Sequence, residues 1–67
     1  MDMKNINTFI YTAELGSFTK AAELLGYSQS TVSFQIRQLE EELGTVLFER
    51  INRTVTLTDR GKEILRY

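Results

Sequence analysis

The sequence of 67 residues contains no cysteine, no histidine and no proline. Without cysteine or histidine it lacks the commonest metal ligands and the commonest general base, and it has neither a phosphate-binding loop nor a nucleophile elbow. No apolar run approaches the roughly 20 residues of a membrane-spanning helix, and the first residues lack the charged-then-apolar layout of a signal peptide. These absences predict a protein that is not an enzyme, has no catalytic, cofactor or metal site, does not enter a membrane, and resides in the cytoplasm.

The net charge of −1 does not by itself indicate a nucleic-acid-binding protein, because a basic surface is the usual first sign of one. The acidic residues, however, are segregated along the chain. None occurs between Glu23 and Glu40, and none occurs between Glu49 and Asp59. Two stretches are therefore free of carboxylates although the total charge is negative.

At 42% hydrophobic and 25% charged residues, the chain has the composition of one globular domain. Apolar residues recur at helical spacing, and glycines interrupt this pattern. We expect helices over residues 4–15, 18–25 and 29–43, with Ser17 and Ser28 as N-caps of the second and third.

The second and third predicted helices are joined by a short turn that contains Gly26. Ala21 and Ala22 are small enough to let the two helices cross closely. This arrangement is typical of a helix-turn-helix. On spacing alone, a DNA-binding unit and a plain helical hairpin within a three-helix core both stay open.

After the third helix the pattern changes to β-branched residues. Residues 48–51 and 55–57 are expected to form a short hairpin with a turn at 52–54; an irregular loop is the alternative. Thr58 is a predicted N-cap of a final helix. No stop signal appears before Tyr67, so we expect this helix to continue in a longer protein.

The third predicted helix has two different faces. At about 100° per residue, its apolar residues fall on one side. The opposite side begins with short polar residues and Phe34 and Arg37, and it carries no acid until Glu40. A helix that enters the major groove of DNA needs this pattern at its N-terminal turns, because amides and arginine read base edges and carboxylates repel phosphates. An ordinary solvated surface is the alternative.

Phe34 is unusual on that face. It could pack on a thymine methyl group, or it could be partly buried against Thr31 and Gln38.

Two arginines in the predicted hairpin provide a second candidate contact. Arg53 lies near its tip, where an arginine suits the narrow and electronegative minor groove. For both Arg50 and Arg53, the alternative is a surface ion pair with Glu49 or Asp59.

The segment as a whole closely resembles the N-terminal domain of LysR-type bacterial transcriptional regulators. The resemblance covers nearly the whole chain, and it depends on a set of short motifs in a fixed order: Ala21-Ala22, Ser28-Gln29-Ser30, Ser33 with Ile36, Leu39-Glu40, Leu43-Gly44, Leu47-Phe48 with Arg50, and Leu57-Thr58 with Gly61.

The resemblance implies a winged helix-turn-helix, mainly α with a small β-hairpin. Residues 1–58 would form the DNA-binding domain, with helix 29–43 in the major groove and wing 48–57 near the minor groove. Residues 59–67 would begin a linker helix that pairs two subunits, so a homodimer or higher homo-oligomer is expected. A small-molecule effector would bind only to a domain absent here, and the choice between activator and repressor stays open.

The predicted partner is a double-stranded DNA operator. By resemblance, Thr31 meets the DNA backbone and Arg53 enters the minor groove. Two positions depart from the common pattern, because many family members have arginine where this chain has Phe34 and alanine where it has Arg60. The complete set of predicted DNA-binding residues is Gln29, Ser30, Thr31, Ser33, Phe34, Arg37, Arg50 and Arg53. A winged helix that binds protein instead would need an exposed apolar patch.

Overall fold

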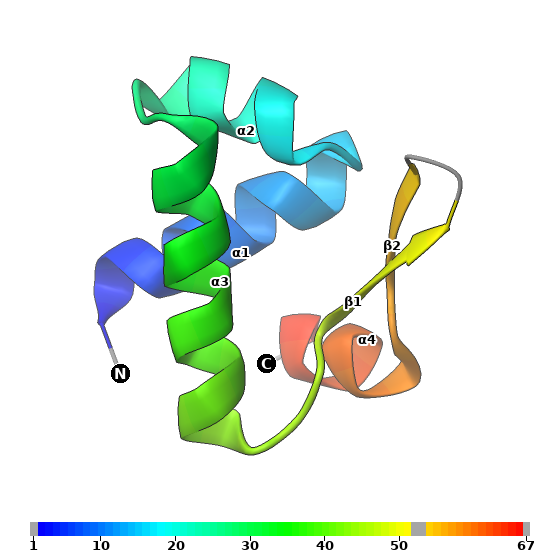
Figure 1. The fold of residues 1–67 in the computed structure, drawn as a ribbon. Coiled ribbons are helices and arrows are strands. Elements are labelled where there is room, and N and C mark those ends of the chain that lie inside the picture. Colours follow the sequence, from blue (N-terminus) through cyan, green and yellow to red (C-terminus); the bar gives the residue numbers. More distant parts are fainter. Residues whose placement is uncertain (1, 52–53, 67) are drawn as a thin grey trace.

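The computed structural model describes residues 2–51 and 54–66. Three helices are followed by a two-stranded antiparallel hairpin and a short final helix (Figure 1). The elements are α1 (Met3–Leu15), α2 (Phe18–Leu25), α3 (Gln29–Leu43), β1 (Phe48–Ile51), β2 (Thr54–Leu57) and α4 (Asp59–Leu65).

The predicted helix caps are confirmed. The hydroxyls of Ser17, Ser28 and Thr58 each accept a hydrogen bond from the backbone N–H three residues further on. The first helix starts one residue earlier than predicted. It begins at Met3 because the Asp2 side chain caps it.

The helices form a bundle with the hairpin at its side. α1 packs against both α2 and α3, and the hairpin stands beside the bundle with α4 at its base (Figure 1). Phe48 lies opposite Leu57 and Arg50 lies opposite Val55 in the strand register. The hairpin prediction is therefore confirmed over the described residues, and the irregular loop is excluded there. The turn was predicted at 52–54, but Thr54 already belongs to β2, and residues 52–53 lie outside the described part of the chain.

Three aromatic rings connect the hairpin to the bundle. The ring centroid of Phe48 lies 5.5 Å from that of Phe9 and 5.9 Å from that of Phe18, both in edge-to-face geometry. Such pairs add about 0.5–1.5 kcal/mol beyond the area they bury. The buried cluster around them comprises Phe9, Phe18, Ala22, Val32, Ile36, Leu39, Leu47 and Phe48.

A buried polar layer lies between α1 and α3. Thr8 and Gln35 are only 0% and 9% exposed, and the Thr8 hydroxyl donates to Gln35 Oε1. Nearer the surface, Asn5 Nδ2 donates to Gln38 Oε1 at 3.0 Å. Because buried polar groups are stable only with their partners in place, this layer favours one rotational setting of α3 relative to α1.

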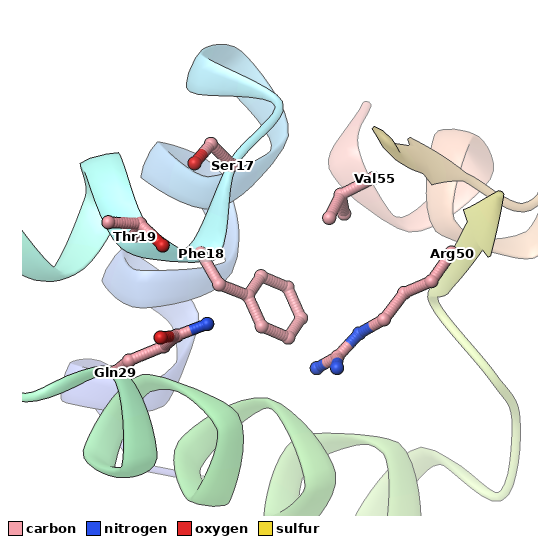
Figure 2. A pocket seen from close by; sticks show the side chains of 6 residues that line it. All are labelled: Ser17, Phe18, Thr19, Gln29, Arg50 and Val55. Carbon is pink, nitrogen blue, oxygen red and sulfur yellow. The ribbon is translucent and has the colours of Figure 1, made fainter. Parts of the chain in front are cut away.

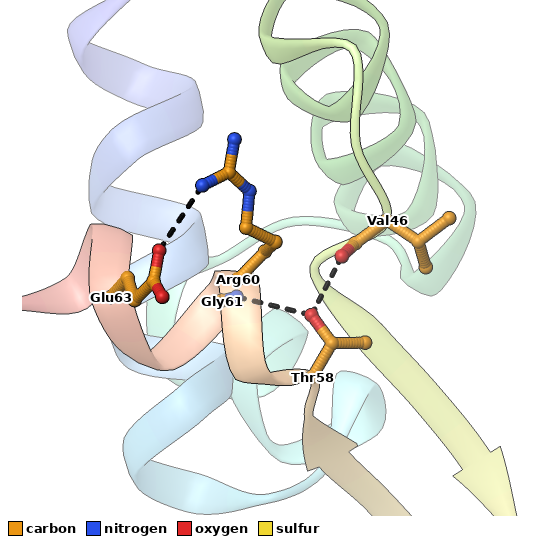
Figure 3. A network of polar contacts seen from close by, with 5 residues as sticks. All are labelled: Val46, Thr58, Arg60, Gly61 and Glu63. Carbon is orange, nitrogen blue, oxygen red and sulfur yellow. Dashed lines mark hydrogen bonds and ion pairs between the residues drawn. The ribbon is translucent and has the colours of Figure 1, made fainter.

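The start of α4 is held against the segment that precedes β1 (Figure 3). The Thr58 hydroxyl donates to the Val46 carbonyl at 2.7 Å and accepts from the Gly61 N–H at 3.0 Å. A Cβ atom on Gly61 would lie 2.5 Å from the Leu47 carbonyl oxygen. Glycine is therefore required at this position by close backbone packing.

We expect Gly61→Ala to lower the free energy of unfolding by about 1–3 kcal/mol, because the new methyl group displaces backbone rather than a flexible side chain. Chemical denaturation measures this loss. Lys62→Ala, at the next and exposed position, is the control and should change stability little. Equal stability of the two variants would contradict the close packing.

Two buried threonines one turn apart on α1 offer a matched test of the polar layer. Thr8→Val removes the hydroxyl that satisfies Gln35 and should destabilise the domain by about 1–3 kcal/mol. Thr12 is equally buried, but its hydroxyl has no hydrogen-bond partner among the described residues. Thr12→Val should therefore be neutral or stabilising, and a similar loss in both variants would argue against the layer.

Candidate nucleic-acid interface

The orientation of α3 is set by the side that it buries. Val32, Ile36 and Leu39 are almost fully inaccessible, so the opposite side of the helix faces outward. The Ser28 cap satisfies the Thr31 N–H, and the first turn contains no acidic residue. The N-terminal turns of α3 therefore present backbone N–H groups and a positive helix dipole to the surroundings.

A shallow depression covers the outward side of these turns. Ser33 is half-buried within it, whereas its other side chains are exposed. Thr31 lies at the flank, half-buried, with its hydroxyl 2.9 Å from Ser28 Oγ. The structure thus brings together five of the predicted residues as the lining of one depression: Gln29, Ser30, Ser33, Phe34 and Arg37.

Arg50 extends this site from the hairpin. Figure 2 shows the Arg50 side chain reaching from β1 towards the ring of Phe18, which lies at the start of α2. Gln29 of α3 lies below this ring in the same view. The guanidinium carbon lies 4.2 Å from the centre of the Phe18 ring, so the contact is a cation–π interaction. The alternative of an ion pair with Glu49 or Asp59 is not what the structure shows. The hollow around this contact is lined by Ser17, Phe18, Thr19, Gln29, Arg50 and Val55.

A third hollow joins the two. It contains Ser33 and Arg37 from the depression and Phe18 and Arg50 from the hairpin side. Because the three hollows share residues, we treat them as one surface, called the concave surface below. The described residues that line it are Ser17, Phe18, Thr19, Gln29, Ser30, Ser33, Phe34, Ile36, Arg37, Glu40, Val46, Phe48, Arg50 and Val55.

The charges on the concave surface favour an anionic partner. Arg37 and Arg50 are exposed cations. Among the described residues, Glu40 is the single carboxylate of its lining, and Glu40 Oε2 accepts the Leu47 N–H at 2.8 Å. The carboxylate is thus engaged with the backbone at the far end of the surface. The segregation of charge along the sequence therefore corresponds to a segregation in space.

Some predicted residues lie apart from this surface or beyond what the structure describes. Arg53 lies outside the described residues. Arg60, which differs from the common family pattern, is exposed and forms an ion pair with Glu63 at 3.2 Å (Figure 3). Its side chain thus points away from the core, and exposed pairs of this kind contribute little to stability.

Three residues of the concave surface were not among the predicted site residues: Ser17, Phe18 and Thr19. Phe18 matches the apolar stripe of the second helix, which predicts a core residue, and most of its surface is buried. Its role beneath Arg50 depends on a contact between residues far apart in the sequence. The sequence feature that could have indicated this part of the site is the pair of polar residues, Ser17 and Thr19, on either side of Phe18 at the N-terminus of α2.

Within residues 2–51 and 54–66, no helix is long and apolar enough to span a membrane. The same residues contain no group of three acidic side chains placed to hold a metal ion.

The fold and this surface define a winged helix-turn-helix. Residues 3–62 match the family described as bacterial regulatory helix-turn-helix protein, lysR family. The chain belongs to this family.

Two curated relatives show how far the similarity extends. The chain is 48% identical over 67 residues to the HTH-type transcriptional regulator YwqM of Bacillus subtilis. It is also 48% identical over 64 residues to the HTH-type transcriptional activator IlvY of Salmonella typhimurium. These matches cover 100% and 96% of the chain but only 23% and 22% of the two relatives.

Solved structures of similar domains have nearly the same fold as this chain. The BenM_DBD/catB site 1 DNA complex has a TM-score of 0.94 and 42% identity, over the whole of this chain and 74% of that chain. The CbnR_DBD–DNA complex has a TM-score of 0.93 and 38% identity, over 98% and 76% of the respective chains.

Proposed function

We propose that this domain binds double-stranded DNA in a sequence-specific manner, with α3 in the major groove and wing 48–57 near the minor groove. The observation that carries this proposal is the concave surface, where an acid-free helix N-terminus lies beside two exposed arginines. A helix is the element that fits the major groove, and its N-terminal residues are those that reach the base edges.

The side chains on this surface suit different parts of DNA. The Gln29 amide can donate to and accept from adenine, and the hydroxyls of Ser30 and Ser33 can bond to several bases. Arg37 can bond to guanine or to a phosphate. We assign Thr31, at the flank, to the DNA backbone, a contact that positions the protein without reading sequence.

The hairpin contributes charge in a different way. Arg50 is held over the Phe18 ring, so its guanidinium is already oriented before DNA arrives, and we assign it to a phosphate. For Arg53, its position between the two strands in the sequence supports a minor-groove contact.

The relatives support a regulatory role. Two similar domains have been crystallised in complexes with DNA, and the curated relatives are transcriptional regulators. We therefore propose a bacterial cytoplasmic regulator that is not an enzyme. Its residues 1–58 form the DNA-binding domain, and residues 59–67 begin a linker helix.

Selection from a random duplex pool tests the function directly. The chain should retain DNA that shares a short enriched motif. Recovery of no motif at low salt would favour a winged helix that binds protein.

The same selection separates base reading from backbone positioning. Gln29→Ala should relax the preference at particular base pairs, at a cost of about 1–3 kcal/mol there. Thr31→Ala should instead lower affinity for all sequences alike. Asn7→Ala removes an exposed amide from α1, outside the concave surface, and should change neither property. Indistinguishable profiles for the first two variants would refute the assignment.

A further part of the proposal concerns assembly. α1, α2 and α3 each end at a glycine in the left-handed conformation, whereas Arg66 after α4 keeps right-handed angles (φ −71°, ψ −22°). This geometry suits a helix that continues and pairs two subunits, so that two domains read two half-sites. A small-molecule effector would act through a separate domain of that longer protein.

The assembly proposal predicts weak binding by a single domain. A protein extended through the continuing helix should bind a two-half-site operator roughly 10² times more tightly than residues 1–67, because joining two modules raises the effective concentration of the second. Titrations at one fixed salt concentration, with sedimentation to report the oligomeric state, provide the measurement. If both proteins are monomeric and bind equally well, the dimer argument fails.

A further inference from the structure

Phe34 stands out from the other phenylalanines of the chain. Of the four, Phe9, Phe18 and Phe48 are buried and meet in edge-to-face contacts. Phe34 is 63% exposed. Single exposed apolar residues are common on protein surfaces, so its exposure alone carries no information; its location does.

This location is the depression on the outward side of α3. Phe34 lines the depression on α3 together with four polar or charged side chains. It lies one helical turn after Ser30 and one turn before Gln38, and it belongs neither to the buried cluster nor to the apolar residues packed against it. Its 63% exposure argues against the predicted alternative of partial burial against Thr31 and Gln38. Within the described part of the chain, packing into the hydrophobic core does not account for an aromatic ring at this position.

The chemistry of the ring restricts what it can recognise. A benzyl group has no hydrogen-bond donor or acceptor for a base edge and no charge for a phosphate. In the major groove, the apolar feature that distinguishes one base pair from another is the 5-methyl group of thymine, and phenylalanine is among the side chains that contact it. The acid-free surroundings and nearby Arg37 fit a polyanion better than an apolar protein partner.

We propose that Phe34 determines specificity by packing on the 5-methyl group of a pyrimidine in the recognised site, which is thymine in unmodified DNA. This inference rests on the proposed function. It also implies that 5-methylcytosine at the same position is preferred over cytosine, because its methyl group points into the same groove.

Replacing thymine by deoxyuracil tests the contact, since this change removes the methyl group and leaves every hydrogen-bonding group in place. In the motif selected by the chain, each thymine is replaced in turn. At one position, the loss should weaken binding about fourfold, the effect of removing one methyl group from a buried apolar contact. Exchanging cytosine for 5-methylcytosine there should strengthen binding by a similar factor.

Variants of the chain identify the side chain responsible. Phe34→Ala should bind the thymine and uracil sites equally, whereas Phe34→Leu, which keeps an apolar surface, should retain part of the difference. Met3→Ala removes another exposed apolar side chain, 68% exposed and at the start of α1, and should leave the fourfold difference intact. Thermal unfolding should show that all three variants fold, since both positions are exposed.

The outcomes distinguish this inference from the function on which it rests. An enriched motif without any methyl-sensitive thymine, or a sensitivity that persists in Phe34→Ala, overturns the role of Phe34 and leaves DNA binding standing. A Phe34→Ala variant that loses affinity equally for every sequence also overturns it. If the chain enriches no motif at all, the proposed function fails, and the methyl contact fails with it.

Discussion

The contact of Phe48 with Phe9 and Phe18 holds the hairpin against the helical bundle, and the shape of the concave surface depends on it. Phe48 lies in β1, two residues before Arg50, and side chains two apart in a strand point to the same face. When Phe48 packs into the core, Arg50 is therefore turned towards the same side. There it lies on the Phe18 ring. One aromatic residue thus connects the stability of the domain to the placement of a cation in its interface.

The rotation of α3 is the second constraint on the site, because it decides which residues face outward. The apolar stripe alone allows some freedom, since hydrophobic contacts are not directional. The hydrogen bond between Thr8 and Gln35 is directional, and it is buried. Breaking it would leave an unpaired amide in the interior, which is costly. The polar layer therefore helps to fix the face that carries Ser33 and Arg37.

Apart from Glu40, the acidic residues that the structure describes lie outside the lining of the concave surface. The chain carries more acidic than basic residues, yet the concave surface exposes arginines. Glu40 belongs to its lining, but a hydrogen bond to the Leu47 N–H engages its carboxylate. That bond also stabilises the segment between α3 and β1. Glu40, which would repel DNA phosphates, thus has a structural role near the C-terminal end of α3, away from the N-terminal turns that are proposed to contact the bases.

The sequence by itself determined the helices, their caps and the outward face of α3, because helical periodicity and capping depend on residues within a few positions of one another. The hairpin was likewise predictable from the local alternation of β-branched and polar residues. The tertiary structure alone decided that Arg50 lies on Phe18 and that Thr8 bonds to Gln35. These pairs are separated by 32 and 27 residues, and no local pattern encodes such a contact. The exposure of Phe34 was also undecided in the sequence, because an aromatic residue at the edge of a helical face can turn inward or outward, and only the packing of its neighbours settles which.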